Sequence, residues 1–233
     1  MLSDLLTQPL KGLLFDLDGT LLDSAPDIAK GLDGALAELG LPLAGETKTR
    51  QWIGNGAKVL VARALADIRQ CDEAAVDSAE LEQAFECFLN HYGQVSAQFS
   101  ALYDGVLPAL KHWQQQGIKM AVVTNKPEQF VAPLLVRFGL SDFFQCAVGG
   151  DSLSDKKPAP APLLFACRQM NLAVENCVMI GDSRNDVEAA RAANMPIACV
   201  TYGYNHGEPI SDSKPDFIAD NISELLTVVG IPV

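Results

Sequence analysis

Short apolar runs alternate with longer amphipathic segments over most of the chain. The runs are too short and too apolar for surface helices, so they predict buried strands; they lie at 13–15, 120–123, 146–148, 178–180 and 197–200. The segments between them have helical spacing and helix boundary signals; they cover 106–116, 127–139, 162–170 and 186–193, and Asn221 is expected to cap a last helix. Strands that alternate with helices predict an α/β fold, with a Rossmann-like, mostly parallel sheet covered on both faces.

The stretch after the first predicted strand has a different pattern. Asp23 or Ser24 can cap a helix that ends at Gly40, and periodic segments follow at 57–68 and 80–92, with no convincing strand before about residue 96. A single strand is not stable alone, so the first strand should belong to the later sheet. The predicted organisation is a core domain of residues 1–22 and 97–233, with an all-helical cap domain, residues 23–96, inserted into it.

Polar residues follow three of the predicted strands. Asp16 and Asp18 come after the first, Thr124 and Asn125 after the second, and Gly181-Asp182 with Asp186 after the fourth. Right-handed crossovers place the carboxyl ends of parallel strands along one edge of the sheet, where such sheets bind ligands. These side chains are therefore expected to meet.

Carboxylates gathered at the end of an apolar strand need a cation or a proton. An all-oxygen set suits Mg²⁺ better than zinc, although the sequence does not distinguish Mg²⁺ from Mn²⁺. Lys157, beside Pro158, is the better candidate of a lysine pair to enter the site and hold a phosphoryl oxygen. The competing interpretations are a solvated turn at Asp16 and Asp18, and an exposed loop lysine.

The charge composition indicates which kinds of binding partner are unfavourable. The 233 residues carry 17 Lys and Arg against 29 Asp and Glu, a formal net charge of −12, and the basic residues are scattered. This argues against a nucleic-acid or anionic membrane partner. The six Cys form no CxxC pair, the three His have no partner pattern, and Met1 to Asp4 lack the basic region of a signal peptide. A reducing cytoplasm is the expected location, and a monomer and a homodimer both stay open.

Four ordered stretches resemble the motifs of haloacid dehalogenase-like phosphohydrolases. They are Asp16-Leu17-Asp18-Gly19-Thr20, Thr124-Asn125, Lys157-Pro158 and Gly181-Asp182-Ser183-Arg184-Asn185-Asp186. The helical insert resembles the C1-type cap of that family. Three further stretches resemble its phosphoglycolate phosphatase branch; they are 52–57, 157–163 and 201–207.

The resemblance implies a role for each matching residue. Asp16 would attack phosphorus and form an aspartyl-phosphate, and Asp18 would act as general acid and then general base. Asp16, Asp182 and the main-chain oxygen of Asp18 would hold Mg²⁺, with Asp186 acting directly or through water. Thr124 and Lys157 would neutralise and position the phosphoryl group, and Asn125 would share in substrate binding.

The cap is expected to select the leaving group. For 2-phosphoglycolate, a small phosphorylated metabolite, the backbone amides around Gly54, Asn55 and Gly56 are candidates to bind the carboxylate, with Arg50 and Arg63 as possible helpers. A helix-joining turn is an equally good interpretation of these glycines. The alternatives are a phosphatase or phosphomutase for another small sugar phosphate and, from a different class, a signalling module phosphorylated on Asp.

Overall fold

The core of the protein is a six-stranded parallel sheet, which confirms the predicted α/β fold class. The computed structural model describes residues 9–228, so the ends of the predicted core domain, including the Met1–Asp4 stretch, lie outside the described residues. The strand order is β5-β4-β1-β6-β7-β8, with every pair parallel. The strands are β1 (Gly12–Phe15), β4 (Lys119–Val123), β5 (Cys146–Val148), β6 (Cys177–Gly181), β7 (Ile197–Val200) and β8 (Phe217–Ala219).

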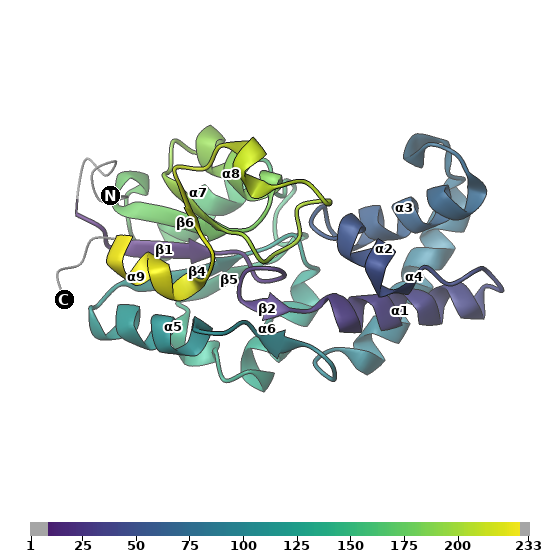
Figure 1. The fold of residues 1–233 in the computed structure, drawn as a ribbon, viewed down its shortest axis with the longest axis horizontal. Helices are drawn as coiled ribbons and strands as arrows, with labels where there is room; N and C mark the ends of the chain where they lie inside the picture. The colour runs from purple at the N-terminus through teal and green to yellow at the C-terminus, as the bar shows by residue number, and fades with distance from the viewer. Residues whose placement is uncertain (1–8, 229–233) are drawn as a thin grey trace.

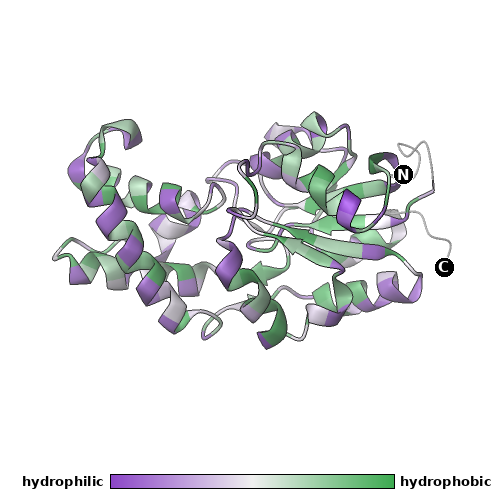
Figure 2. Cartoon of the chain, turned by 180° about the vertical axis from the view of Figure 1, so that it is seen from behind, coloured by the Kyte–Doolittle hydropathy of each residue, from purple (hydrophilic) through white to green (hydrophobic). Residues whose placement is uncertain are grey.

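Strand β1 lies at the centre of this sheet, between β4 and β6, and all four of its residues are buried. Leu13 and Phe15 point into the core on one face and Leu14 into the core on the other, as alternating side chains of a strand must. Both faces are therefore apolar, and Figure 2 shows hydrophobic residues concentrated along the strands.

Helices cover both faces of the sheet. On the Phe15 face lie α5 (Val106–Gln115), α6 (Glu128–Arg137) and α9 (Leu225–Val228); on the Leu14 face lie α7 (Ala161–Gln169) and α8 (Arg184–Ala192). Helix α8 begins two residues before the predicted start, because Ser183 and the side chain of Asp186 cap it. Strand β8 was not expected. It is a three-residue edge strand, and its short apolar run lies between Asp216 and Asp220 with only one buried residue.

The helical insert forms a second body beyond the carboxyl end of β1, to the right in Figure 1. Its helices are α1 (Ala25–Glu38), α2 (Gly45–Trp52), α3 (Ala57–Arg69) and α4 (Ser78–Val95). Their buried side chains form a hydrophobic cluster of their own. Helices α1 and α4 approach closely at Gly31, where a Cβ would lie 2.9 Å from the Cα of Tyr92. The absence of a side chain at residue 31 allows this contact.

The two connections between core and insert pair with each other. Strand β2 (Leu22–Asp23) lies antiparallel to β3 (Ala101–Leu102), a small sheet that the sequence pattern did not predict. Asp27 strengthens the second connection, because its carboxylate accepts hydrogen bonds from the backbone N–H groups of Phe99 and Ser100, at 2.8 and 3.0 Å. The division at residues 22/23 and 96/97 stays a prediction. Across the described residues, no helix has both the length and the apolar composition that a bilayer crossing requires.

Candidate active site

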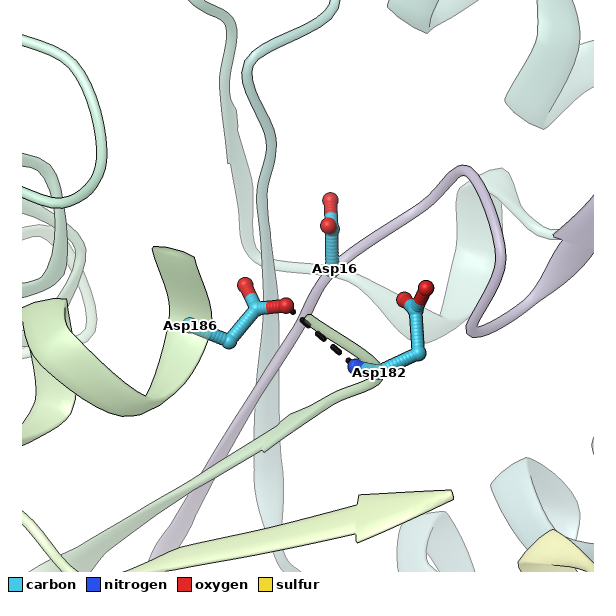
Figure 3. Close-up of side chains that lie close together, drawn as sticks. All are labelled: Asp16, Asp182 and Asp186. Carbon is cyan, nitrogen blue, oxygen red and sulfur yellow. Dashed lines mark hydrogen bonds between the residues drawn. The ribbon is translucent and has the colours of Figure 1, made fainter. Parts of the chain in front are cut away.

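Three carboxylates converge at the carboxyl ends of β1 and β6. One oxygen from each of Asp16, Asp182 and Asp186 lies within 4.8 Å of the other two, and all three residues are buried. Figure 3 shows the side chains around a common space, with Asp16 following β1, Asp182 following β6 and Asp186 on α8. Strands β1 and β6 are neighbours in the sheet, and this brings Asp16 close to Asp182 and Asp186, which follow it by 166 residues or more in the sequence.

Both oxygens of Asp186 are already hydrogen-bonded. Oδ2 accepts from the backbone N–H groups of Asp182 and Ser183, at 3.2 and 3.1 Å, and from the Ser183 hydroxyl at 2.7 Å. Oδ1 accepts from Lys157 Nζ at 2.6 Å. These bonds fix the carboxylate in one orientation, with little capacity left for a further ligand.

Asp182 is fixed by residues from two other loops. Its carboxylate accepts from the Thr20 hydroxyl at 2.6 Å and from the backbone N–H of Tyr204 at 2.6 Å. Gly19, at φ 90°, packs so closely that a Cβ would lie 2.3 Å from Asp182 Oδ2. Burial, followed by the nearby Asp16 and Asp186, raises the pKa of Asp182 well above its usual value.

Asp16 has one engaged oxygen and one that the described hydrogen bonds leave open. Oδ1 accepts from the backbone N–H of Leu17 at 2.7 Å and lies 3.1 Å from Lys157 Nζ. No hydrogen bond within residues 9–228 reaches Oδ2. Burial raises the pKa of Asp16 to about 7, against the lowering effect of Lys157. A cation among these carboxylates would favour the ionised form.

Lys157 is the lysine that enters the site. Its side chain is 1% exposed, and its Nζ lies between Asp16 and Asp186. Burial opposes its charge, but the two carboxylates outweigh that effect and raise the pKa of Lys157. Its neighbour Lys156 donates to the backbone carbonyl of Asn55 at 2.7 Å instead.

Asp18 has a partner that the sequence reasoning missed. Its two carboxylate oxygens lie 3.0 and 3.1 Å from Lys126 Nζ, and Oδ1 also accepts from the Ser24 hydroxyl at 2.6 Å. Burial opposes the charge of Lys126, yet Asp18 and Tyr92 raise its pKa. In the sequence, the one indication that Lys126 belongs to the site is its position, because it directly follows Thr124 and Asn125 at the end of a strand.

An apolar pocket separates Asp16 and Asp18 from the helices of the insert. Thr124, Asn125, Gly54 and Gly56 line it, whereas Asn55 does not. The remaining lining residues are Ile28, Ile53, Ala57, Leu60, Phe88, Tyr92, Lys126 and Pro127, besides the two aspartates. The structure thus places four of the predicted substrate-binding residues around one cavity of about 40 Å³.

Asn125 and Asn55 both connect the core with the insert. Asn125 Nδ2 donates to the carbonyls of Gly54 and Lys157, at 3.0 and 2.9 Å. Asn55 Nδ2 donates to Asn185 Oδ1 at 3.0 Å. The positive φ angles of Gly54 (126°) and Gly56 (93°) form the turn between α2 and α3 that these bonds hold.

Arg50 and Arg63 lie outside this pocket in the described structure. Arg50 pairs with Asp23 at 3.0 Å and with Glu46 at 2.9 Å. Arg63 pairs with Glu73 at 3.0 Å and donates to the Trp52 carbonyl. Their positive charges are therefore engaged within the insert and at its first connection.

The carboxylate cluster fits a hard divalent cation. The oxygens that converge are carboxylate oxygens, and burial, followed by repulsion from Asp16 and Asp186, raises the pKa of Asp182, which a bound cation would counteract. Gly19 and Gly203 leave room for the Asp182 carboxylate, because a Cβ at either would lie 2.3 Å from Oδ2. The residues present are thus suitable for a metal ion.

Comparison with known proteins decides the family. A family model for haloacid dehalogenase-like hydrolases matches residues 10–194. This chain belongs to that family. It is 47% identical over 216 residues to the phosphoglycolate phosphatase of Pseudomonas syringae pv. syringae (strain B728a), covering 93% of this chain and 78% of that protein. Its identity to the phosphoglycolate phosphatase of Nitrosococcus oceani is 46%, over 97% of this chain and 99% of that protein.

A solved structure agrees with both the fold and the family. The crystal structure of a predicted phosphoglycolate phosphatase from Haemophilus somnus 129pt superposes with a TM-score of 0.88 at 37% identity, covering 96% of this chain and all of that one. The haloacid dehalogenase-like fold predicted from the four motifs is confirmed, and with it phosphoester hydrolysis as the class of reaction. Enzymes of this family generally use a metal ion, in agreement with the Asp16–Asp182–Asp186 cluster.

Proposed function

We propose that this enzyme hydrolyses 2-phosphoglycolate to glycolate and phosphate, with Mg²⁺, in the cytoplasm. The observation that carries the proposal is the position of two aspartates, Asp16 and Asp18, beside a buried lysine and at a small pocket. The two named relatives, each 46% identical or more over most of this chain, support the choice of substrate. The pocket beside Asp16 and Asp18 is small and mostly apolar, which favours a small leaving group such as glycolate.

In this proposal Asp16 Oδ2 is the nucleophile. Oδ1 is held by Leu17 and Lys157, so the other oxygen is left to attack phosphorus. The P–O bond to glycolate breaks as the bond to Asp16 forms, and Asp18 gives its proton to the departing alkoxide. In the second step Asp18 takes a proton from water, which attacks phosphorus and releases Asp16. Lys157 and the Thr124 hydroxyl neutralise and position the phosphoryl oxygens.

The metal would be held by Asp16, Asp182 and the main-chain oxygen of Asp18. Asp186 would contact it through water, because both of its own oxygens already accept hydrogen bonds. When bound, Mg²⁺ shields the negative charge of the nucleophile from that of the phosphate. The insert, residues 23–96, acts as a cap that excludes bulk water while the leaving group is bound.

Two experiments test the proposal. Phosphate release should be lost in Asp16→Asn, and retained activity would remove the proposed nucleophile. A panel of 2-phosphoglycolate, hexose phosphates and nucleotides should rank 2-phosphoglycolate first by kcat/KM. Equal rates across the panel would refute the substrate, and transfer of the phosphoryl group to a second sugar position without phosphate release would indicate a phosphomutase.

A further inference from the structure

Lys126 occupies an unusual position for a lysine. Its side chain is 3% exposed, and its Nζ lies 3.0 and 3.1 Å from the two oxygens of Asp18. On the other side it lies 4.7 Å from the ring centroid of Tyr92, which belongs to α4 of the insert. The charge is therefore enclosed between the core and the helical insert, at the pocket that faces Asp16.

Lys126 supplies the positive charge of this pocket. Among the described residues that line it, Lys126 is the one cationic side chain, and most of the side chains on the insert side are apolar. Ile28, Ile53, Leu60 and Phe88 offer no hydrogen bonds to a ligand. A carboxylate brought into such surroundings needs a paired cation, since burying an unpaired charge is strongly unfavourable.

The other positive groups nearby are engaged elsewhere. Lys157 lies between Asp16 and Asp186, on the side where the phosphoryl group would be held. Lys156 donates to Asn55, and Arg50 and Arg63 pair within the insert and its connection. Of these cations, only Lys126 contacts Asp18, the residue that would protonate the leaving oxygen.

The chemistry of 2-phosphoglycolate matches this arrangement. One CH₂ group separates its ester oxygen from its carboxylate carbon. A general acid must lie within hydrogen-bond reach of that ester oxygen, so the carboxylate falls close to whatever touches Asp18. Lys126 Nζ and the Ser24 hydroxyl are the side-chain groups found there, and Lys126 is the charged one.

We propose that Lys126 is the counter-ion for the substrate carboxylate and so determines the preference for a phosphorylated hydroxy acid. This inference rests on the proposed function. Lys126 keeps its contact with Asp18 and adds a charge-assisted hydrogen bond to the substrate. The turn amides at Gly54 and Gly56 are the competing candidates, and the experiment separates the two.

The test compares two substrates that differ in the carboxylate. kcat/KM is measured for 2-phosphoglycolate and for ethyl phosphate in wild type, in Lys126→Met and in Lys111→Met, a matched change at an exposed position on α5. Loss of a charge-assisted hydrogen bond should lower the ratio of the two kcat/KM values by roughly 10- to 100-fold in Lys126→Met. The ratio in Lys111→Met should equal that of wild type.

The outcomes distinguish this inference from the proposed function. A wild-type ratio near one overturns the substrate and the role of Lys126 together. A high wild-type ratio that survives Lys126→Met overturns the role of Lys126 alone and favours the Gly54–Gly56 amides. Thermal melts verify that each variant is folded, and Lys126→Gln, which keeps a polar tip, replaces the Met variant if that one does not fold.

Discussion

Replacing Lys157 by Met should destabilise the metal-free protein as well as impair catalysis. Lys157 Nζ lies 2.6 Å from Asp186 and 3.1 Å from Asp16, and its side chain is 1% exposed. Met is close to Lys in length, so the change removes the charge with little loss of packing. It leaves two buried carboxylates without their cation.

The size of the effect follows from this burial. Removing one partner of a buried ion pair costs about 3–5 kcal/mol, because the remaining charge is uncompensated. In a protein of this size, each kcal/mol corresponds to about 2–4 °C in Tm. The expected decrease in Tm is therefore roughly 6–20 °C. Asp16 can become neutral by binding a proton, which reduces the cost of its unpaired buried charge. We therefore expect a decrease in Tm in the lower half of that range.

The assay is differential scanning calorimetry in EDTA at pH 8, with Lys156→Met as the control. Lys156 is adjacent in sequence, but its Nζ donates to a neutral carbonyl, so its loss should change Tm by only about 3 °C or less. A decrease below about 2 °C for Lys157→Met would refute the argument that this lysine compensates the buried carboxylates.

Two further predictions concern the connection and the metal. Tyr204→Phe removes the hydroxyl that donates to Asp23 and accepts from the Ala25 N–H. The free energy of unfolding, measured by urea denaturation, should therefore decrease by about 1.5–3 kcal/mol. An unchanged urea midpoint would contradict a stabilising role for these two hydrogen bonds. Mg²⁺ should raise the Tm of the wild-type protein above its value in EDTA, and this increase should be absent in Asp182→Asn. An equal increase in that variant would show that the ion binds elsewhere.

The sheet could be predicted because its signal is local. Each strand from β1 to β7 in the main sheet is a short, mostly apolar run, the pattern expected of a parallel sheet that is covered on both faces. The edge strand β8 has only a three-residue run, Phe217 to Ala219, that is partly buried, and Leu22–Asp23 of the β2–β3 pair is two residues long. Their formation depends on neighbours that are distant in sequence.

The positions of Asp16, Asp182, Asp186 and Lys157 follow from topology and charge. Parallel strands bring their carboxyl ends to one edge, and three buried carboxylates require a cation, for which Lys157 beside Pro158 was the best local candidate. The hydrogen bonds that fix Asp182 could not be predicted in the same way. They come from Thr20 and from Tyr204, and neither residue type indicates such a partner by itself.

The burial of Lys126 could not be predicted from the local sequence. In sequence it is one lysine after a strand, a position that is usually solvent-exposed, and nothing near it marks it as different. It becomes buried because α4, some 30 residues earlier, places Tyr92 over it. Residues of the core and of the insert thus meet at one ammonium group, where the role proposed for Lys126 would link the reaction to the choice of substrate. Thr124 and Lys126, two residues apart, would then hold opposite ends of one substrate molecule, so a shift of the insert that uncovers Lys126 should weaken carboxylate binding before it affects the phosphoryl group.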